Sequence, residues 1–220
     1  MTSKAQARSV IFDYDGTLVD TAAAFVDSIN EALRKVELRN ATRREISGMS
    51  LRSIISKRLA ESATGFSIEA VFDLMWNEFA ETLSTPFPLR EGAAQTLNEL
   101  ARCGVGLALI SKRGGRAAVL PLVELRMAAL EDLFRFVKVG VGLDEYGPTI
   151  SKALAQLKCS AQDSVIVSDW CKDIEYAKGL GIKTVGITGG VSDEDEHQNA
   201  GADWIVERLS EIPSLLTAQL

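Results

Sequence analysis

Two aspartates stand at alternate positions directly after a short apolar run near the amino terminus. Asp13 and Asp15 follow the β-rich segment Val10-Ile11-Phe12 and are followed in turn by Gly16 and Thr17. Residues at alternate positions of a strand point to the same side, so we expect both carboxylates to face one site. Glycine lets the chain leave the strand sharply, and the threonine hydroxyl can satisfy backbone groups of the turn. One carboxylate could then attack a substrate while the other handles a proton.

The same pair of carboxylates predicts a bound cation. Two close carboxylates without a cation would repel each other, and one of them would stay protonated. Both are ionised at neutral pH only with a cation such as Mg²⁺, which prefers hard oxygen ligands in an octahedron. The alternative is a solvated acidic turn after an edge strand, because aspartate-rich turns are common.

Two more apolar runs end in side chains that could act on a phosphoryl group. Ser111 and Lys112 follow the run Val105 to Ile110, and the serine hydroxyl could donate to a phosphoryl oxygen. Asp169 comes just after the run Val165 to Val167, and Asp173 stands at the predicted start of the next helix. A carboxylate directly after a buried strand is costly unless it is paired or metal-bound. Asp173 alone could be a helix cap, and a serine at a strand end is often a turn residue.

Short β-rich runs with helical patterns between most of them must position these side chains. This alternation is typical of a parallel sheet with helices on both faces, the Rossmann-like α/β class. Ligands of such sheets bind beyond the carboxyl ends of the strands, where the polar residues stand. The predicted strands are Ser9 to Phe12, Val105 to Ile110, Phe136 to Val141, Val165 to Val167, Thr184 to Ile187 and Trp204 to Val206.

An all-helical module is predicted between the first two strands. About 90 residues there contain no convincing strand, and apolar residues recur at the three-to-four-residue spacing of amphipathic helices. We therefore expect a catalytic core formed by residues 1–20 and 86–220, with a helical cap formed by residues 21–85. Pro86 and Pro88 would mark the return to the core, since proline ends helices.

Composition narrows the class of protein. The 220 residues are 46% hydrophobic, enough for a full core, and carry a net charge of −6. Sequence-independent nucleic-acid binding needs basic surface and is not expected. No apolar stretch approaches the roughly 20 residues that span a bilayer, and without a signal-peptide apolar region before the first strand we expect no signal peptide. We expect a cytoplasmic protein without membrane partners, either a monomer or a homodimer. The cysteines are read as reduced thiols, two of them in the core: Cys103, Cys159 and Cys171.

In its motifs and their order the chain resembles the haloacid dehalogenase-like hydrolase superfamily, and within it the phosphoglycolate phosphatase-like subgroup with a helical cap. The resemblance covers nearly the whole chain. The matching segments are Asp13-Tyr14-Asp15-Gly16-Thr17-Leu18-Val19-Asp20, Leu109-Ile110-Ser111, Ser168-Asp169 with Asp173, Thr184-Val185-Gly186-Ile187-Thr188-Gly189-Gly190 and Ala200-Gly201-Ala202-Asp203.

This resemblance implies roles for the residues already singled out. Asp13 would attack phosphorus to form an aspartyl-phosphate, and Asp15 would protonate the leaving oxygen and then activate water. Mg²⁺ would be held by Asp13, the Asp15 carbonyl and Asp169, offsetting the repulsion between nucleophile and phosphate. Asp173 would support the metal's water shell or orient lysines, and Ser111 would hold a phosphoryl oxygen.

Other candidate site residues come from positions where the chain departs from the subgroup's motifs and from the predicted cap. The subgroup's usual lysine ahead of the fourth motif is missing, and Lys152 is the best substitute because its stem could reach back to the nucleophile. The expected substrate-binding residues are Gly16, Thr17, Arg52 and Lys112, of which Arg52 follows a cap loop that would reach over the leaving group. Trp170 could stack on a substrate or plug the site. Three further residues are expected on solvated surface: Arg43, Arg44 and His197.

The leading functional hypothesis is a Mg²⁺-dependent phosphatase acting on a small phosphorylated metabolite. A phosphosugar mutase of the β-phosphoglucomutase type is an alternative, because Asp20-Thr21-Ala22 resembles that group. A third hypothesis, motivated by the missing lysine, is a protein that binds a phosphorylated ligand or a protein partner and catalyses poorly. An aspartate at position 15 favours a phosphatase over a dehalogenase, which has no need of that acid.

Overall fold

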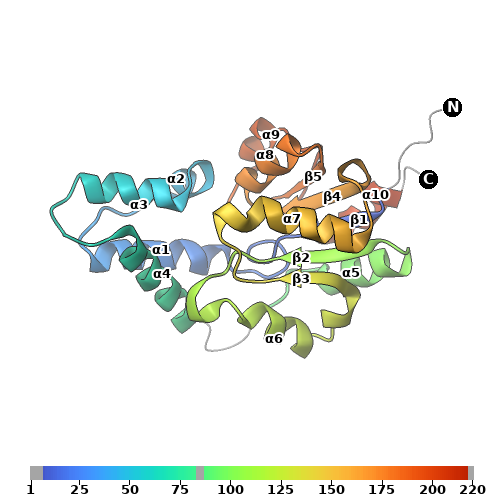
Figure 1. The fold of residues 1–220 in the computed structure, drawn as a ribbon, viewed down its shortest axis with the longest axis horizontal. Helices are drawn as coiled ribbons and strands as arrows, with labels where there is room; N and C mark the ends of the chain where they lie inside the picture. The colour runs from blue at the N-terminus through green and yellow to red at the C-terminus, as the bar shows by residue number, and fades with distance from the viewer. Residues whose placement is uncertain (1–6, 83–86, 218–220) are drawn as a thin grey trace.

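A six-stranded parallel sheet lies between two layers of helices, with a separate group of helices beyond its carboxyl edge (Figure 1). The computed structural model describes residues 7–82 and 87–217. The strand order is β3-β2-β1-β4-β5-β6, and every neighbouring pair is parallel. The strands are β1 (Ser9–Phe12), β2 (Gly106–Ile110), β3 (Phe134–Lys138), β4 (Ser164–Ser168), β5 (Lys183–Ile187) and β6 (Trp204–Val206).

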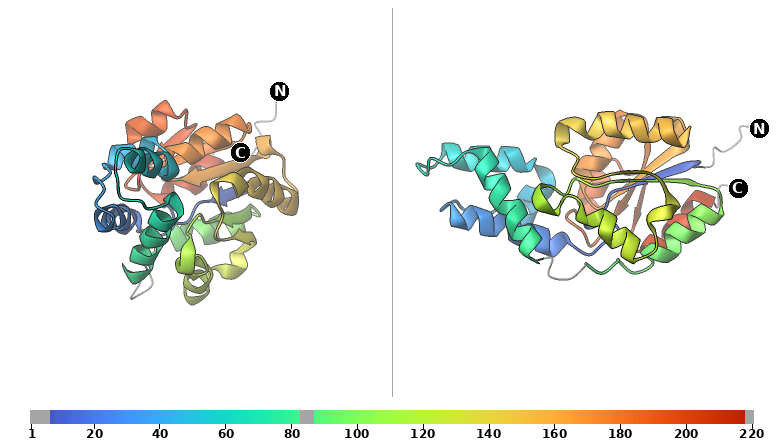
Figure 2. Two further views of the ribbon diagram at one scale, coloured as in Figure 1. Left: turned by 60° about the vertical axis from the view of Figure 1, so that its left-hand side comes forward. Right: turned by 60° about the horizontal axis from the view of Figure 1, so that its bottom comes forward.

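Both faces of the sheet are buried, and the alternation of β1 shows how. Val10 and Phe12 belong to one apolar cluster with residues of α5, α6 and α10. Ile11 belongs to a second cluster with residues of α7 and α8 on the opposite face. Figure 2 shows these two helical layers from the side. The core helices are α5 (Ala93–Arg102), α6 (Leu120–Met127), α7 (Leu143–Leu157), α8 (Cys171–Gly179), α9 (Glu194–Asn199) and α10 (Ile212–Thr217).

The predicted α/β class is confirmed, with one strand displaced. The sequence predicts a strand from Phe136 to Val141, whereas β3 is Phe134–Lys138. The chain turns away after Lys138 because Gly140 adopts a left-handed conformation at φ +70°. Val141 is nevertheless buried, and its backbone N–H donates to the Ser111 carbonyl. An apolar residue that packs beyond the end of a strand was read as part of that strand.

Four of the five described helices that lie between β1 and β2 in the sequence form a group of their own. They have their own apolar cluster, to which Ile29, Leu33, Ile54, Val71 and Met75 contribute at helical spacing. Threonine and serine caps begin two of these helices, with a capping box at Thr42. We call this group the helical module; it comprises α1 (Ala22–Lys35), α2 (Arg43–Gly48), α3 (Leu51–Ala60) and α4 (Ile68–Thr82).

The two connections between helical module and core run side by side. The Asp20 N–H donates to the Pro88 carbonyl, and the Arg90 N–H donates to the Leu18 carbonyl. The connections therefore form a short paired stem at the base of the module. The predicted boundary at residues 85–86, with Pro86, lies outside the described residues.

Two general predictions can be compared with the fold. No helix of the described residues is long and apolar enough to cross a membrane. Of the three cysteines, Cys171 is buried, Cys159 is half-buried and Cys103 is exposed. Cys171 and Cys159 both pack in the core, as expected for two of the three, whereas Cys103 lies at the end of α5 on the surface.

Candidate active site

Adjacent strands bring Asp13 and Asp169 together. Phe12 of β1 is paired with Val167 of β4, and the Asp13 N–H donates to the Val167 carbonyl at 3.0 Å. Asp13 and Asp169 therefore follow neighbouring strand ends. Their side chains are almost fully enclosed, with exposed fractions of 7% and 1%.

Lys112 supplies the ammonium group of this site. Its Nζ lies 3.1 Å from Asp13 Oδ1 and 2.6 Å from Asp173 Oδ2. The ammonium also packs over the rings of Tyr146 and Trp170, at 4.8 Å and 5.8 Å from their centroids. Burial alone would lower the pKa of Lys112, but Asp13 and Asp173 raise it well above its usual value. The lysine is therefore held in its charged form next to Asp13.

The structure does not place Lys152 in the role that sequence reasoning gave it. Lys152 is exposed on α7, whereas Lys112 at the end of β2 already contacts Asp13. The error has a topological cause: β2 is the neighbour of β1, so a residue just past β2 needs no long reach. The sequence predicts Lys112 only as a substrate-binding residue, and its position one residue beyond Ser111 is the signal that points to it.

Asp15 is held by a buried arginine that the sequence did not reveal. Arg113 Nη2 donates to Asp15 Oδ1 at 2.6 Å, and Arg113 Nε also lies within 3.2 Å of both Asp15 oxygens. The other side of the guanidinium donates to Glu124 of α6, which also accepts a bond from the Tyr14 hydroxyl. The Thr21 hydroxyl donates to Asp15 at 3.1 Å. This network fixes the Asp15 carboxylate in one orientation.

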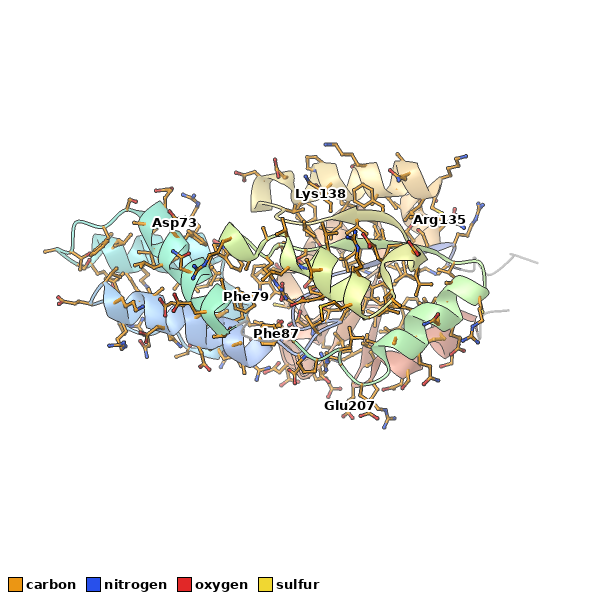
Figure 3. The ribbon with its side chains drawn as sticks, turned by 90° about the horizontal axis from the view of Figure 1, so that it is seen from below. Asp73, Phe79, Phe87, Arg135, Lys138 and Glu207 are labelled. Atoms are coloured by element: carbon orange, nitrogen blue, oxygen red, sulfur yellow. The ribbon has the colours of Figure 1, made fainter. Side chains whose placement is uncertain are left out.

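Aromatic rings enclose the buried arginine at the junction of core and helical module. The Arg113 guanidinium lies 5.1 Å from the Tyr14 ring centroid and 5.4 Å from that of Phe79 on α4. Phe79 stacks on Phe87, which follows the helical module, with their centroids 5.9 Å apart. Figure 3 shows Phe79 and Phe87 next to each other where the module meets the core.

Asp169 is hydrogen-bonded to the turn that follows β1 and to the segment that follows β5. The Thr17 hydroxyl donates to Asp169 Oδ1, and the Val191 N–H donates to Oδ2 at 2.7 Å. A Cβ at Gly16 or at Gly190 would lie 2.2 Å from Asp169 Oδ2, so only glycine fits either position. Gly16 and Thr17 were predicted to bind substrate. In the structure the Thr17 hydroxyl bonds the Asp169 carboxylate, and Gly16 lies in close contact with it.

Serine hydroxyls at two strand ends complete the polar network. Ser168 Oγ donates to Asp173 Oδ2 at 2.8 Å, which fixes the carboxylate that receives Lys112. Ser111 is fully buried and its Oγ accepts the Arg113 N–H at 3.2 Å. Ser111 thus lies at the end of β2 as predicted, next to both cationic residues of the site.

The electrostatics of the site favour an additional cation. Burial, together with Asp173 and Asp169, raises the pKa of Asp13 well above its usual value, although Lys112 acts to lower it. Burial also raises the pKa of Asp169 to about 6, against the bonds from Val191 and Thr17. The lysine therefore does not balance three enclosed carboxylates, and a divalent cation would.

The site fits Mg²⁺ with fewer carboxylate ligands than the sequence predicts. Among the described residues no three His, Cys, Asp or Glu side chains form a ready-made metal cluster. The Asp15 carboxylate faces Arg113, and the Asp173 carboxylate faces Lys112 and Ser168. Mg²⁺ commonly uses only one or two carboxylates, with waters and substrate phosphate completing the octahedron. Asp13 and Asp169 would provide these two carboxylates.

The helical module is docked on the core on one side through α2. Arg43 donates to the carbonyls of Val191 and Gly190. The Ser47 hydroxyl lies 2.7 Å from that of Ser192. Trp170 Nε1 donates to the Ser47 carbonyl at 2.9 Å. Arg43 is exposed, as expected for a solvated face, and its guanidinium also reaches these core carbonyls. Arg44 is exposed as expected.

On the other side, the module is docked through α4. The Trp76 side chain lies against Gly114 and Gly115, where an added Cβ would come within 2.5 Å and 2.7 Å of it. Arg116 reaches from the same turn to Glu81 of α4 at 3.2 Å. The core segment after β2 therefore carries Lys112, Arg113 and the docking surface for α4 in succession.

Two further sequence predictions can be compared with the structure. His197 is fully buried rather than exposed, and its Nε2 lies 3.3 Å from the Ile187 carbonyl. Arg52 lines the cavity described below, but its side chain is 58% exposed and paired with Glu69 at 3.2 Å.

A cavity of about 490 Å³ lies between the helical module and the carboxyl ends of the strands. Its floor includes Asp13, Asp15, Lys112, Arg113 and Asp169. Its roof and sides are mainly apolar and come from α1, α3, α4 and the segments around Trp170 and Val191. The predicted carboxylates thus lie at the base of a substrate-sized space.

Comparison with known proteins agrees with this geometry. Residues 10–187 match the model of the haloacid dehalogenase-like hydrolase family. A phosphoglycolate phosphatase of Agrobacterium fabrum is 29% identical over 206 residues, covering 88% of this chain and 85% of the relative. A phosphoglycolate phosphatase of Pseudomonas fluorescens is 30% identical over 196 residues, covering 83% and 70%.

A solved structure gives the same fold. The haloacid dehalogenase-like family hydrolase of Streptococcus pneumoniae superposes with a TM-score of 0.76 at 18% identity, covering 99% of this chain and 100% of the other. The family match spans the helical module and the strands from β1 to β5. The chain therefore belongs to the haloacid dehalogenase-like hydrolases, in the phosphoglycolate phosphatase-like group of phosphoric monoester hydrolases.

Proposed function

We propose that the protein hydrolyses a small phosphorylated metabolite through an aspartyl-phosphate on Asp13, with Mg²⁺ as cofactor. The observation that carries the proposal is the position of Asp13 at the floor of the cavity, with its Oδ1 3.1 Å from the Lys112 ammonium. Asp15 stands two residues on and lines the same cavity. The relatives named phosphoglycolate phosphatase support a small phosphomonoester as substrate.

Asp13 and Asp15 divide the reaction between them. An Asp13 oxygen attacks phosphorus while the bond to the leaving oxygen breaks, and Asp15 donates its proton to that oxygen. Asp15 then accepts a proton from water, which attacks phosphorus and releases phosphate and the free Asp13 carboxylate. Both proton transfers need Asp15 in a fixed place, which Arg113 and Thr21 provide as positioning residues.

Polar and charged groups around the transferring phosphoryl group would come from the turn beyond β2, from the end of β4 and from α8. Lys112 would hold a phosphoryl oxygen next to Asp13, and Asp173 and Ser168 keep the ammonium in place. Ser111 would donate its hydroxyl proton to another oxygen. Mg²⁺, held by Asp13, the Asp15 carbonyl and Asp169, would neutralise charge between nucleophile and substrate.

The helical module acts as a cap in this proposal. Docked through α2 and α4, it covers the cavity and keeps bulk water from the reacting groups. Opening of the module would admit substrate and release products, as lids do in many enzymes. The cytoplasmic location and the choice between monomer and homodimer stay predictions.

The proposal is tested with p-nitrophenyl phosphate and the intact protein. Phosphate release should require Mg²⁺, be abolished by chelation and return when Mg²⁺ is added. Asp13→Asn should lower kcat by about a thousandfold or more, because the nucleophile is lost. Turnover undiminished in Asp13→Asn would contradict the assigned nucleophile. The mutase alternative is tested with phosphosugars, where an isomerised sugar phosphate instead of free phosphate would support it.

A further inference from the structure

The part of the cavity beyond the reacting groups is larger than a two-carbon leaving group needs. The whole cavity has a volume of about 490 Å³, within the roughly 300–1,000 Å³ of pockets that bury drug-sized ligands. The phosphoryl group occupies the floor, close to Asp13 and Lys112. The remaining space lies under the helical module, so the module's side chains determine what the leaving alcohol contacts.

Aromatic side chains line this space. Phe25, Phe72 and Trp76 of the module, with Trp170 of the core, face the cavity and are only partly buried in the apolar cluster of the module. Phe25 and Trp76 are neighbours, with ring centroids 6.0 Å apart. Part of each ring therefore stays uncovered in the cavity. Trp170 Nε1 is bonded to the Ser47 carbonyl, so this indole presents its apolar surface rather than a donor.

Aliphatic residues complete the wall between these rings. Ala22, Leu51 and Val191 line the cavity and contribute no polar side chain. Apolar surface lining a site gains free energy when an apolar ligand group covers it. The wall thus favours a leaving group that is flat and apolar.

The charges of the wall disfavour a second anionic group on the substrate. Among the described residues that line the cavity, the positively charged ones are Lys112, Arg113 and Arg52. The first two are bonded to carboxylates at the floor, and Arg52 is paired with Glu69 on the surface. Asp144 and Glu145 add exposed negative charge at the rim. A carboxylate on the leaving group would meet more repulsion than attraction.

We propose that the substrate is a phosphomonoester whose leaving alcohol carries an uncharged aromatic ring, seated between Phe25, Phe72, Trp76 and Trp170. This rests on the proposed phosphatase function and specifies its substrate class. The ring binds under the helical module while the phosphoryl group lies at Asp13. Phosphoglycolate, with a carboxylate in place of the ring, is then a poor substrate of this protein.

The test compares three alkyl phosphates of similar intrinsic reactivity: 2-phenylethyl phosphate, ethyl phosphate and phosphoglycolate. Ethyl phosphate lacks the ring, and phosphoglycolate has the same chain length with a carboxylate. We expect kcat/KM for 2-phenylethyl phosphate to exceed that for either of the others by at least about tenfold, the gain from burying one large apolar group. Equal values, or a preference for phosphoglycolate, would overturn the substrate class and leave the phosphatase function intact.

Matched phenylalanine substitutions locate the effect. In Phe72→Ala the ratio of kcat/KM between 2-phenylethyl and ethyl phosphate should fall about tenfold toward one, because one wall ring is lost. Phe66 is an exposed phenylalanine that precedes α4, and Phe66→Ala should keep the wild-type ratio. An unchanged ratio in Phe72→Ala, or an equal loss in Phe66→Ala, would contradict the assigned ring site.

Binding measured without turnover separates this proposal from the phosphatase function. Titration calorimetry with Asp13→Asn and Mg²⁺ should show 2-phenylethyl phosphate binding at least about tenfold more tightly than ethyl phosphate. If this preference is found while the wild-type protein hydrolyses no phosphomonoester, the ring site stands and the phosphatase function falls. If the wild-type protein hydrolyses esters but no preference is found, the ring site falls.

Discussion

At the scale of single residues, the chemistry follows from a few contacts that the sequence shows only in part. Asp13, Asp15 and Asp169 could be singled out because carboxylates after apolar strands are costly without a function. Their partners are harder to identify: the sequence suggests Lys112 only as a substrate-binding residue and does not single out Arg113, because both follow β2 about a hundred residues away. The spacing of residues along the sequence does not tell which lysine lies near Asp13 in space. The predicted Lys152 is therefore replaced in the structure by Lys112.

A pair of lysine substitutions tests this correction. Lys112→Met should lower kcat for p-nitrophenyl phosphate by about a hundredfold to a thousandfold, because a charge at the transferring phosphoryl group is removed. Lys152→Met should stay within about twofold of the wild type, as an exposed helix position usually does. Thermal unfolding of both variants checks that they fold. Loss of activity in Lys152→Met with retention in Lys112→Met would restore the original prediction.

At the scale of elements, periodicity predicts the sheet well and its irregular ends poorly. β1 and β6 match the predicted runs, whereas β3 ends earlier because Gly140 bends the chain. The segment around His197 was read as an acidic loop. It is the helix α9, begun by a capping box between Asp193 and Glu196, which turns His197 inward against Gly186. The aspartate three residues before a glutamate was a signal for this helix.

The buried histidine predicts a pH dependence of stability. Burial lowers the pKa of His197, against the bond to the Ile187 carbonyl, so the folded protein favours the neutral ring. The unfolded chain binds the proton more readily, so this contribution to stability is present above about pH 6.5 and is lost as the pH falls below it. The free energy of unfolding, measured with urea at pH 7.5 and 5.5 in the apo protein, should fall more in the wild type than in His197→Gln. The same fall in both would show that His197 does not titrate in this way.

At the scale of the whole molecule, one continuous segment after β2 links the floor of the site to the docking surface of the helical module. The residues after β2 provide Lys112 and Arg113 to the floor, and then Gly114 and Gly115 as the surface on which Trp76 rests. The docking of the module is therefore coupled to the position of the arginine that holds Asp15. The sequence predicts the inserted helices from their periodicity. It does not predict where they dock, because docking depends on close backbone approach at glycines.

Substitution at this contact tests the coupling. Gly115 has φ +57°, and an added Cβ would lie 2.7 Å from Trp76, so Gly115→Ala should displace α4 from the core. We expect kcat/KM to fall by about tenfold or more, because small displacements at a site are costly, and acrylamide quenching of tryptophan fluorescence to increase. Gly179→Ala, with nothing within 4 Å of the added Cβ, is the control. Wild-type kinetics and quenching in Gly115→Ala would show that this contact does not hold the module.

The most direct test of the central claim is chemical trapping of the phosphorylated enzyme. The protein is mixed with excess p-nitrophenyl phosphate and Mg²⁺, quenched during turnover and reduced with borohydride, which converts an aspartyl-phosphate to homoserine. Peptide mass spectrometry should then find homoserine at position 13, with unmodified aspartate at positions 15, 169 and 173. Homoserine at another position, or its absence from every peptide at full turnover, would contradict Asp13 as the nucleophile.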